Sequence, residues 1–425
     1  MPFRSRHIIK SDLVRNSSKL LSANVVAQAV ALLVYPILTR MFSQEDFGLM
    51  NLFLSIGGIM VLLSTFEYHY AIVLPKSESE GRSLFSLVIV SVAVVSILVL
   101  LTVPFSVPIS RLFNAPDLAR WYWLMPLYVL AMGLWQALSY WYTRQRGFGR
   151  ISGYQVGQSV ANSAIKVGWG AARGAGGGLI VGSVAAPVLA VGVSVVRSWR
   201  SGLLRFGRID RSQLSGVAAR YRNFPLYNLP KSLLNSFSSN LPILLLTSSF
   251  GLSQIGFLGM AFTLALRPVQ MVCSSFYQVL YQRVAQLLNE GRSMGSFFRV
   301  FVSRYLLVAV PVSVVLYLVL PWLTRVMLGE GWQLTGTLIR LMLPWLVCVG
   351  LNCMINFLPD IFMRQRGLLI FEVLGLLLRL GGLLVGMYVG SFRVAVVMFF
   401  AASALLQLLQ VLWMLYMVRS YDNRL

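Results

Sequence analysis

Long apolar runs are the feature that most restricts how this 425-residue chain can fold. Runs of about 18 or more apolar residues recur along its whole length, and an α-helix needs that length to cross the hydrocarbon core of a bilayer. Only 12% of the residues are charged, against roughly a quarter in a soluble globular domain. Membrane-spanning β-strands would be shorter and would alternate polar with apolar residues. The sequence therefore predicts an all-α polytopic membrane protein.

We predict twelve transmembrane helices from these runs. The predicted spans are residues 20–39, 47–66, 84–104, 121–141, 151–170, 177–196, 225–247, 255–280, 305–323, 336–358, 367–389 and 394–417. The basic segment before the first span resembles the start of a signal peptide. The apolar run that follows it is too long for a signal-peptide core, and no small-residue cleavage site comes after it. We expect this segment to be retained.

The net charge of +23 raises the question of a nucleic-acid partner, which the placement of the charges argues against. Most lysines and arginines between the spans fall in every second connection, beginning with the N-terminal segment. This asymmetry matches the positive-inside rule and predicts that both termini are cytoplasmic. The densest basic cluster lies at about residues 197–224, between the sixth and seventh spans. We interpret it as a linker that faces solvent or lipid headgroups.

An internal repeat divides the chain at this linker. The tetrapeptide RQRG occurs at 144–147, after the fourth span, and again at 364–367, after the tenth. Because six spans separate the two copies, both lie on one side of the membrane, where we expect cytoplasmic turns. The sequence predicts two six-helix bundles, residues 1–205 and 206–425, related as parallel repeats. Substrate is then expected between the bundles, near the bilayer midplane.

Five cations fall inside predicted spans without enough acidic partners, and one of them, Arg340, lies near an external span end where its side chain can reach the membrane surface. The other four are Lys166, Lys231, Arg267 and Arg379. Each charge near the centre of a spanning helix costs about 3 kcal/mol on insertion scales. A water-filled cationic cavity accounts for them better than lipid exposure does. Such a cavity suits an anion, because arginine and lysine are common partners of phosphate.

Polar side chains accompany three of these cations at helical spacing, in steps of three or four residues. The amides that we predict to bind substrate beside the cations are Gln158, Asn162, Asn228, Asn235 and Gln270. The alternative is that such side chains only join helices to one another by hydrogen bonds.

Acidic residues that could bind a coupling ion are few. Glu67, Glu372 and Asp360 are the candidates, and either H⁺ or Na⁺ could be the ion. Glu372 lies seven residues before Arg379 on one helical face, so it could equally be an ion-pair partner of that arginine. The sequence shows no catalytic constellation, no metal-ligand spacing and no cofactor motif, and its three cysteines lie inside apolar runs.

The stretch LLSANVVAQAVALLVYPILTRMFSQEDFGLMNLFLS at residues 20–55 resembles the opening of bacterial Wzx-type flippases for polysaccharide repeat units. These belong to the MOP superfamily, whose fold is MATE-like. The resemblance implies transport of an undecaprenyl-diphosphate-linked oligosaccharide, such as an O-antigen unit, across the bacterial inner membrane by alternating access. It implies membrane lipid, a polysaccharide polymerase and a chain-length regulator as partners, and no enzymatic activity.

Three alternatives remain open at this stage. A MATE-like antiporter for cationic drugs shares the fold but would need buried carboxylates in its cavity. A lipid II-type flippase is similar, but that group usually has fourteen spans. A membrane-embedded polymerase would need a large external loop, and the longest one expected here, residues 105–120, is short.

Overall fold

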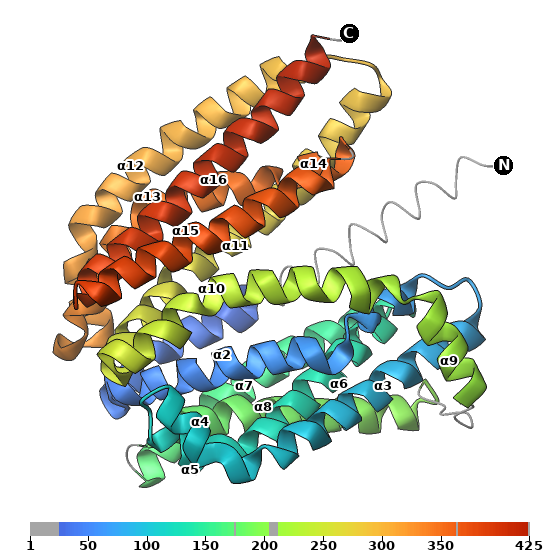
Figure 1. Cartoon of the computed structure of the whole chain (residues 1–425), viewed down its shortest axis with the longest axis vertical. Helices are drawn as coiled ribbons and strands as arrows, with labels where there is room; N and C mark the ends of the chain where they lie inside the picture. Colours follow the sequence, from blue (N-terminus) through green and yellow to red (C-terminus); the bar gives the residue numbers. More distant parts are fainter. Residues whose placement is uncertain (1–24, 174–175, 204–210, 363, 424–425) are drawn as a thin grey trace. The chain divides into compact units, whose positions relative to one another are not determined.

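The protein is built from helices throughout the part that the structure, a computed structural model, describes: residues 25–173, 176–203, 211–362 and 364–423 (Figure 1). Eight helices in these ranges are long and apolar enough to cross a membrane. They comprise α2 (Gln44–Thr65), α3 (Glu78–Leu101), α8 (Gly178–Arg200), α11 (Leu252–Asn289), α12 (Gly295–Leu328), α13 (Gln333–Ile355), α15 (Gln365–Tyr388) and α16 (Phe392–Asp422). The prediction of an all-helical membrane protein is confirmed.

The other four predicted spans also fall on helices, which are shorter or more polar. These helices are Val25–Met41, α6 (Met125–Arg144), α7 (Phe148–Arg173) and α10 (Leu229–Phe250). The short helices α4 (Ser106–Leu112), α5 (Asp117–Trp121), α9 (Arg211–Arg220) and α14 (Leu358–Ile361) lie in the connections, with the 3₁₀ helix η1 (Tyr68–Val73) after α2. Every predicted span thus overlaps a helix, while the crossing of the membrane by all twelve stays a prediction.

The start of α2 shows how the sequence sets a helix boundary. The Ser43 hydroxyl accepts a hydrogen bond from the Asp46 backbone N–H at 3.2 Å, and the Ser43 backbone N–H donates to the Asp46 carboxylate at 2.9 Å. This reciprocal capping box satisfies two backbone donors that the first turn of a helix otherwise leaves unpaired. It lies within the SQED segment of the stretch that resembles the flippase family.

Backbone contacts divide the chain into two compact units, here called the N-unit (residues 1–236) and the C-unit (residues 237–425). The division falls inside α10, and the predicted bundles 1–205 and 206–425 stay a prediction. In the N-unit, α6 packs against α2, α3 and α8, and α7 packs against α8. A Cβ atom at Gly133 of α6 would lie 2.7 Å from the Ser64 hydroxyl oxygen and 2.8 Å from Val92. Glycine is needed there because three helices approach closely.

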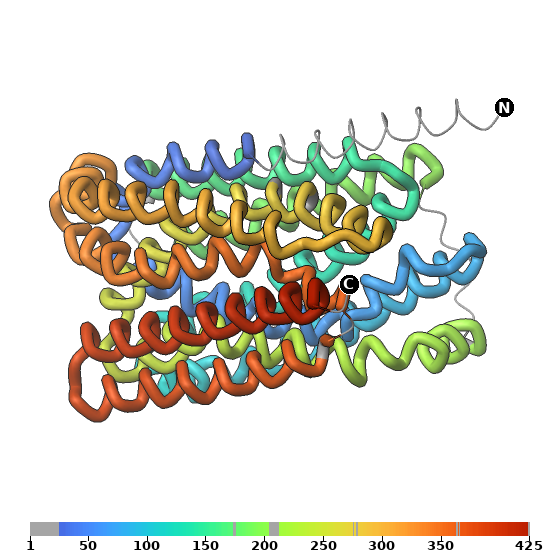
Figure 2. Tube along the Cα trace, turned by 90° about the horizontal axis from the view of Figure 1, so that it is seen from above, coloured from blue at the N-terminus to red at the C-terminus, as the bar shows by residue number. Residues whose placement is uncertain are grey.

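In the C-unit, α13 packs against α11, α12 and α16, and α15 and α16 form an antiparallel pair (red and orange in Figure 2). A Cβ atom at Gly386 would lie 2.1 Å from the Cα of Ala395, so the two helices of this pair touch backbone to backbone near their connection. Helix α12 is largely unburied, with only 6% of its most apolar window inside the protein. Most of its surface is therefore available to lipid.

The two RQRG copies adopt different structures. The first ends α6 at Arg144 and turns through Arg146, which has a φ of 55°. The second begins α15, with Arg364 as the residue before its first turn. In the first copy the Arg144 guanidinium donates to the carbonyls of Ile72 (3.0 Å), Pro75 (2.7 Å) and Ser77 (2.8 Å). Both copies lie where one helix ends and the next begins, and their cytoplasmic location stays a prediction.

We expect Arg144→Ala to lower the stability of the N-unit by about 2–4 kcal/mol, because three charge-assisted hydrogen bonds to backbone carbonyls are lost. Thermal unfolding of the purified protein in detergent measures the effect. Arg146→Ala is the matched control, since this exposed neighbour removes the same charge from the same turn. Equal melting temperatures for the two variants would contradict the role given to Arg144.

Candidate functional site

Lys166 of α7 is the most deeply buried of the four predicted cations, with 7% of its surface exposed. Its ammonium group lies 3.5 Å from the Met50 sulfur of α2. A Cβ atom at Gly182 of α8 would lie 2.5 Å from the Lys166 Cγ, so this glycine leaves room for the lysine stem. Lys166 therefore sits within the packed interior of the N-unit, between α2, α7 and α8.

Arg379 of α15 is held by neutral partners inside the C-unit. Its guanidinium donates to the Ser238 hydroxyl at 2.6 Å and to the Ser403 hydroxyl at 3.1 Å. Within the described part of the chain, no ion pair joins it to Glu372. Two serine hydroxyls fix the arginine in place but do not cancel its charge.

Lys231 and Arg267 are exposed, in contrast to the first two cations. Lys231 lies near the start of α10 in the N-unit, and Arg267 lies in the middle of α11 in the C-unit. Pro268 follows Arg267 directly, and proline inside a helix removes one backbone hydrogen bond. The structure thus places two predicted cations in each unit, one enclosed and one accessible.

The predicted amides divide in the same way. Gln158 and Asn162 of α7 are partly buried, and the Asn162 side-chain oxygen has no hydrogen-bond partner within the described residues. Asn235 and Gln270 are exposed. Asn228 is also exposed and ends a π-helical turn, Phe224–Asn228, that leads into α10. Such turns occur frequently at functional sites.

Glu67 has the most unusual environment among the predicted acids. It follows the end of α2, is 1% exposed, and has one carboxylate oxygen without a hydrogen-bond partner in the described structure. Both Phe66 (φ 46°) and Glu67 (φ 62°) are left-handed. Two successive non-glycine residues in this conformation cost about 1–3 kcal/mol each. The surrounding packing therefore forces the carboxyl into this position.

Aromatic side chains surround the connection that holds Glu67. The His69 and Tyr70 rings lie 4.2 Å apart, and both lie close to the Tyr140 ring of α6, at 5.0 and 5.1 Å. Burial raises the pKa of Glu67 above its ordinary value, and a hydrogen bond from Ser232 of α10 opposes this only in part. Burial also lowers the pKa of His69 to about 4. The pKa of the Glu67 carboxyl is thus held above that of an exposed carboxyl.

The other two predicted acids lack these features. Asp360 is exposed in the short helix α14, and Glu372 is partly buried on α15. Within the described residues, no group of three His, Cys, Asp or Glu side chains comes together in a way that could hold a metal ion.

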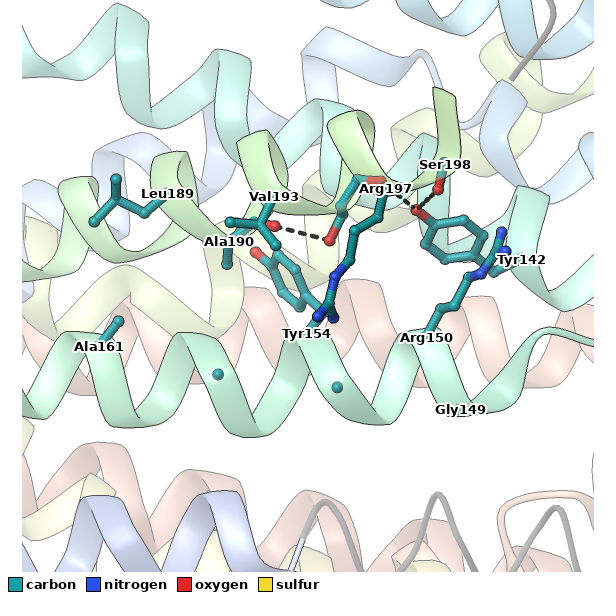
Figure 3. Close-up of a pocket in the computed structure, with 13 residues that line it drawn as sticks. Tyr142, Gly149, Arg150, Tyr154, Ala161, Leu189, Ala190, Val193, Arg197 and Ser198 are labelled. Atoms are coloured by element: carbon teal, nitrogen blue, oxygen red, sulfur yellow. Dashed lines mark hydrogen bonds between the residues drawn. The ribbon is translucent and has the colours of Figure 1, made fainter. Parts of the chain in front are cut away.

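A groove of about 430 Å³ between α7 and α8 was not predicted from the sequence (Figure 3). Arg150 enters it from α7 and Arg197 from α8, and its floor is a row of small residues at every fourth position of α7: Gly149, Gly153, Gly157 and Ala161. Arg150 is oriented by a hydrogen bond to the Ser201 hydroxyl at 3.2 Å. The spacing of these small residues can be read from the sequence. The predicted spans, however, placed Arg150 in a loop and Arg197 in the basic linker, so the groove was missed.

The arrangement of helices is similar to that of several solved membrane transporters. A multidrug resistance transporter of the MATE family and MOP superfamily, solved facing inward, matches with a TM-score of 0.61 at 13% identity, over 95% of this chain and 96% of its own. A MOP superfamily transporter from Pyrococcus furiosus matches with a TM-score of 0.55 at 14% identity, over 97% of this chain and 96% of that transporter. That transporter is described as having a binding pocket of reverse polarity, which suggests a different function for it. A mutant MATE transporter from Vibrio cholerae gives 0.50 at 13%, over 97% and 96%.

These likenesses establish the fold, which the chain shares with solved transporters of the MATE family and MOP superfamily. The chain itself belongs to the polysaccharide biosynthesis protein family, whose family model matches residues 37–336. No curated protein matches it significantly. The family membership confirms the resemblance predicted from residues 20–55.

Glu67 gives the protein a pH-dependent stability of defined sign. Its pKa is raised in the folded state, so its contribution is fully present below the ordinary carboxyl value of 4.5 and is lost as the pH rises through the folded pKa. We expect the melting temperature to fall over this range in the unaltered protein. The melting temperature of Glu67→Gln should not fall over this range. At neutral pH it should exceed that of the unaltered protein by a few degrees, since about 1 kcal/mol of stability shifts the melting temperature of a domain by roughly 2–4 °C.

The matched control is Glu45→Gln, which removes an exposed carboxylate near the opposite end of α2. Thermal unfolding in detergent across this pH range separates the variants. A pH dependence that Glu67→Gln leaves unchanged would exclude Glu67 as its source.

Proposed function

We propose that this protein is a flippase for lipid-linked oligosaccharides. It moves an undecaprenyl-diphosphate-linked repeat unit of a surface polysaccharide, such as O-antigen, from the cytoplasmic to the periplasmic leaflet of the bacterial inner membrane. Twelve spans form two six-helix bundles, and both termini are cytoplasmic. Transport proceeds by alternating access through a cationic lumen.

The environment of Arg379 is the observation that carries this proposal. Family membership supports a polysaccharide precursor as cargo, and the fold supports transport. Arg379 then supplies the chemistry, because a charge in α15 that is hydrogen-bonded to two neutral serine hydroxyls, and that no described residue pairs at ion-pair distance, retains attraction for an anion. A transporter of cationic drugs would require the opposite charge at such a position.

The cargo has a charged part and a neutral part, and the predicted residues suit both. The exposed Lys231 and Arg267 receive the diphosphate and any acidic sugars, while Lys166 and Arg379 add to the positive potential from within the bundles. The amides at positions 158, 162, 228, 235 and 270 hydrogen-bond to sugar hydroxyls. The polyprenyl tail stays in an apolar environment throughout.

Glu67 is the residue that binds the coupled proton. It is buried, it lacks a cationic partner in the described structure, and its pKa is raised by burial, so it exchanges a proton nearer to neutral pH than an exposed carboxyl does. Asp360 and Glu372 are weaker candidates, because the first is exposed and the second lies beside Arg379 on α15. If sodium is the coupling ion instead, transport will depend on sodium and not on the pH gradient.

The periplasmic product is the substrate for assembly of the polymer. We therefore place the protein beside a polysaccharide polymerase and a chain-length regulator, which act after the flipping step.

Lipid-linked sugars extracted from cells that lack the protein test the function directly. Undecaprenyl-diphosphate oligosaccharide should accumulate on the cytoplasmic side, surface polysaccharide should be lost, and the mass of the trapped lipid identifies the cargo. Unchanged lipid-linked sugars together with altered sensitivity to cationic drugs would refute the flippase and favour a small-molecule antiporter.

Neutralising Lys231 or Arg267 should reduce surface polysaccharide by about tenfold or more, because each removes a charged hydrogen bond of about 1.5–3 kcal/mol to the diphosphate. Lys231→Gln and Arg267→Gln are compared with Lys76→Gln and Arg299→Gln, which neutralise exposed cations outside the apolar spans. Immunoblots of membrane fractions confirm equal amounts of protein. Normal polysaccharide in both lumen variants would remove these residues from the site.

Glu67→Gln should uncouple transport from the proton gradient. In proteoliposomes, the unaltered protein is expected to flip lipid-linked sugar faster when a pH gradient is imposed. The variant should show the same rate with and without the gradient, because position 67 can no longer exchange a proton. A variant that still responds to the gradient would show that another group carries the proton.

A further inference from the structure

A groove of about 1080 Å³ lies within the C-unit, and the function proposed above does not use it. Its two walls are α11 and α12, and part of its floor is α13. Its lining is mainly apolar, including four aromatic side chains: Phe276, Phe297, Phe301 and Tyr305. The groove belongs to a single unit and does not depend on how the two units are placed.

Direct contacts between the three helices form the floor. Tyr305 of α12 donates from its hydroxyl to the Val347 carbonyl of α13 at 2.8 Å, and the Cys273 thiol of α11 donates to the Gly350 carbonyl at 3.4 Å. A Cβ atom at Gly350 would lie 2.3 Å from the Tyr305 hydroxyl oxygen. The helices are therefore joined at the floor, and α11 and α12 leave the groove open above it.

The walls present accessible apolar side chains at helical spacing. On α12 the lining positions run from Ser296 to Val312 in steps of three or four residues, which corresponds to about 24 Å along the axis. Val272 and Phe276 on α11 are 50% and 48% exposed, and Val312 on α12 is 50% exposed. The groove is thus longer than one leaflet of a hydrocarbon core of about 30 Å.

The groove is basic and polar in the half that lies toward the turn between α11 and α12. Arg283 of α11 lies toward that turn with Ser293 and Ser296, and Arg304 of α12 lies about midway between Ser296 and Val312. Within the described residues, neither arginine takes part in an ion pair. Both arginines fall outside the predicted spans 255–280 and 305–323, in a connection predicted to be cytoplasmic. The groove therefore leads from the headgroup region into the hydrocarbon region.

We propose that this groove binds the carrier lipid of the cargo, with the polyprenyl chain along α11 and α12 and the diphosphate between Arg283 and Arg304. The inference rests on the proposed function, since it assigns the tail of the same substrate to a place in the fold. It also gives the loading step a location on the side where the lipid-linked sugar is made. The lipid is held by its tail while its head remains free to enter the lumen.

The charges favour a polyprenyl diphosphate over the surrounding phospholipids. Two arginines match the two phosphates of a diphosphate, whereas phosphatidylethanolamine carries one phosphate and a compensating amine. The tail binds by packing against the groove walls, because it already lies in hydrocarbon and gains no hydrophobic transfer energy there. Both ends are required for selectivity.

Photo-crosslinking of the full-length protein in nanodiscs of phosphatidylethanolamine and phosphatidylglycerol tests this proposal. The probe is a long-chain polyprenyl diphosphate with a diazirine in its tail, and the labelled peptides are mapped by mass spectrometry. Labelling should concentrate on residues 268–276 and 297–312. Excess unlabelled polyprenyl diphosphate should remove it, and added phosphatidylglycerol should not.

Val312→Trp fills the groove and should weaken labelling severalfold, because the indole occupies the space where the tail packs against α12. Val310→Trp is the matched control, since Val310 lies two residues away on α12, is 48% exposed and does not line the groove. Equal labelling of the two variants would overturn the proposal, and so would uniform labelling of all lipid-facing helices. Competition by phosphatidylglycerol would do so as well, by making the groove a general lipid site.

The basic end is tested by Arg283→Gln combined with Arg304→Gln. The double variant should lose the preference for the diphosphate probe over a neutral polyprenol probe, while Arg299→Gln, on α12 but outside the groove, should keep it. A double variant that keeps the preference would overturn the role of the two arginines. This readout compares two ligands on one protein, so a general loss of folding does not mimic it.

The binding assay involves no transport, so the two proposals can fail separately. If the probe labels the groove but cells that lack the protein do not accumulate lipid-linked sugar, the flippase is refuted and the groove remains a polyprenyl-lipid site. Trapped lipid-linked sugar without probe in the groove would refute the groove and leave the flippase intact.

Discussion

The low polarity of the bilayer is the constraint on which the rest of this structure depends. It requires the backbone to satisfy its own hydrogen bonds, which makes the fold helical. It also removes the hydrophobic drive for helices to associate, so that close packing depends on small residues such as Gly133 and Gly386 where helices meet. Polar side chains in such a setting must find partners within the protein, as Arg379 does with two serines.

Three charged side chains have separate consequences. Arg379 is hydrogen-bonded to neutral serines, Glu67 is enclosed without a cation among the described residues, and the exposed Arg283 lies toward one end of an apolar groove. In the proposed cycle these positions serve the anionic head, the coupled proton and the carrier lipid. The three tasks fall on different helices, so a substitution in one site leaves the others in place.

The sequence predicted the helices well and the site only in outline. Every predicted apolar range overlaps a helix of the described structure, because run length alone determines whether a segment can span a bilayer. Helical spacing does not reveal which face of a helix is covered, so it could not separate the buried Lys166 from the exposed Lys231. The serine partners of Arg379 lie 141 and 24 residues away, and no local pattern indicates them. The carbonyls that bind Arg144 in the first RQRG copy come from a segment about 70 residues earlier, which no local pattern indicates either.

The left-handed pair Phe66 and Glu67 limits how this protein can change over evolutionary time. Left-handed backbone is tolerated by glycine, asparagine and aspartate and strongly disfavours β-branched residues. Valine, isoleucine and threonine are thereby excluded from both positions, although the apolar surroundings would otherwise suit valine and isoleucine. The break after α2 is preserved by backbone geometry, independently of any selection on the carboxyl group itself.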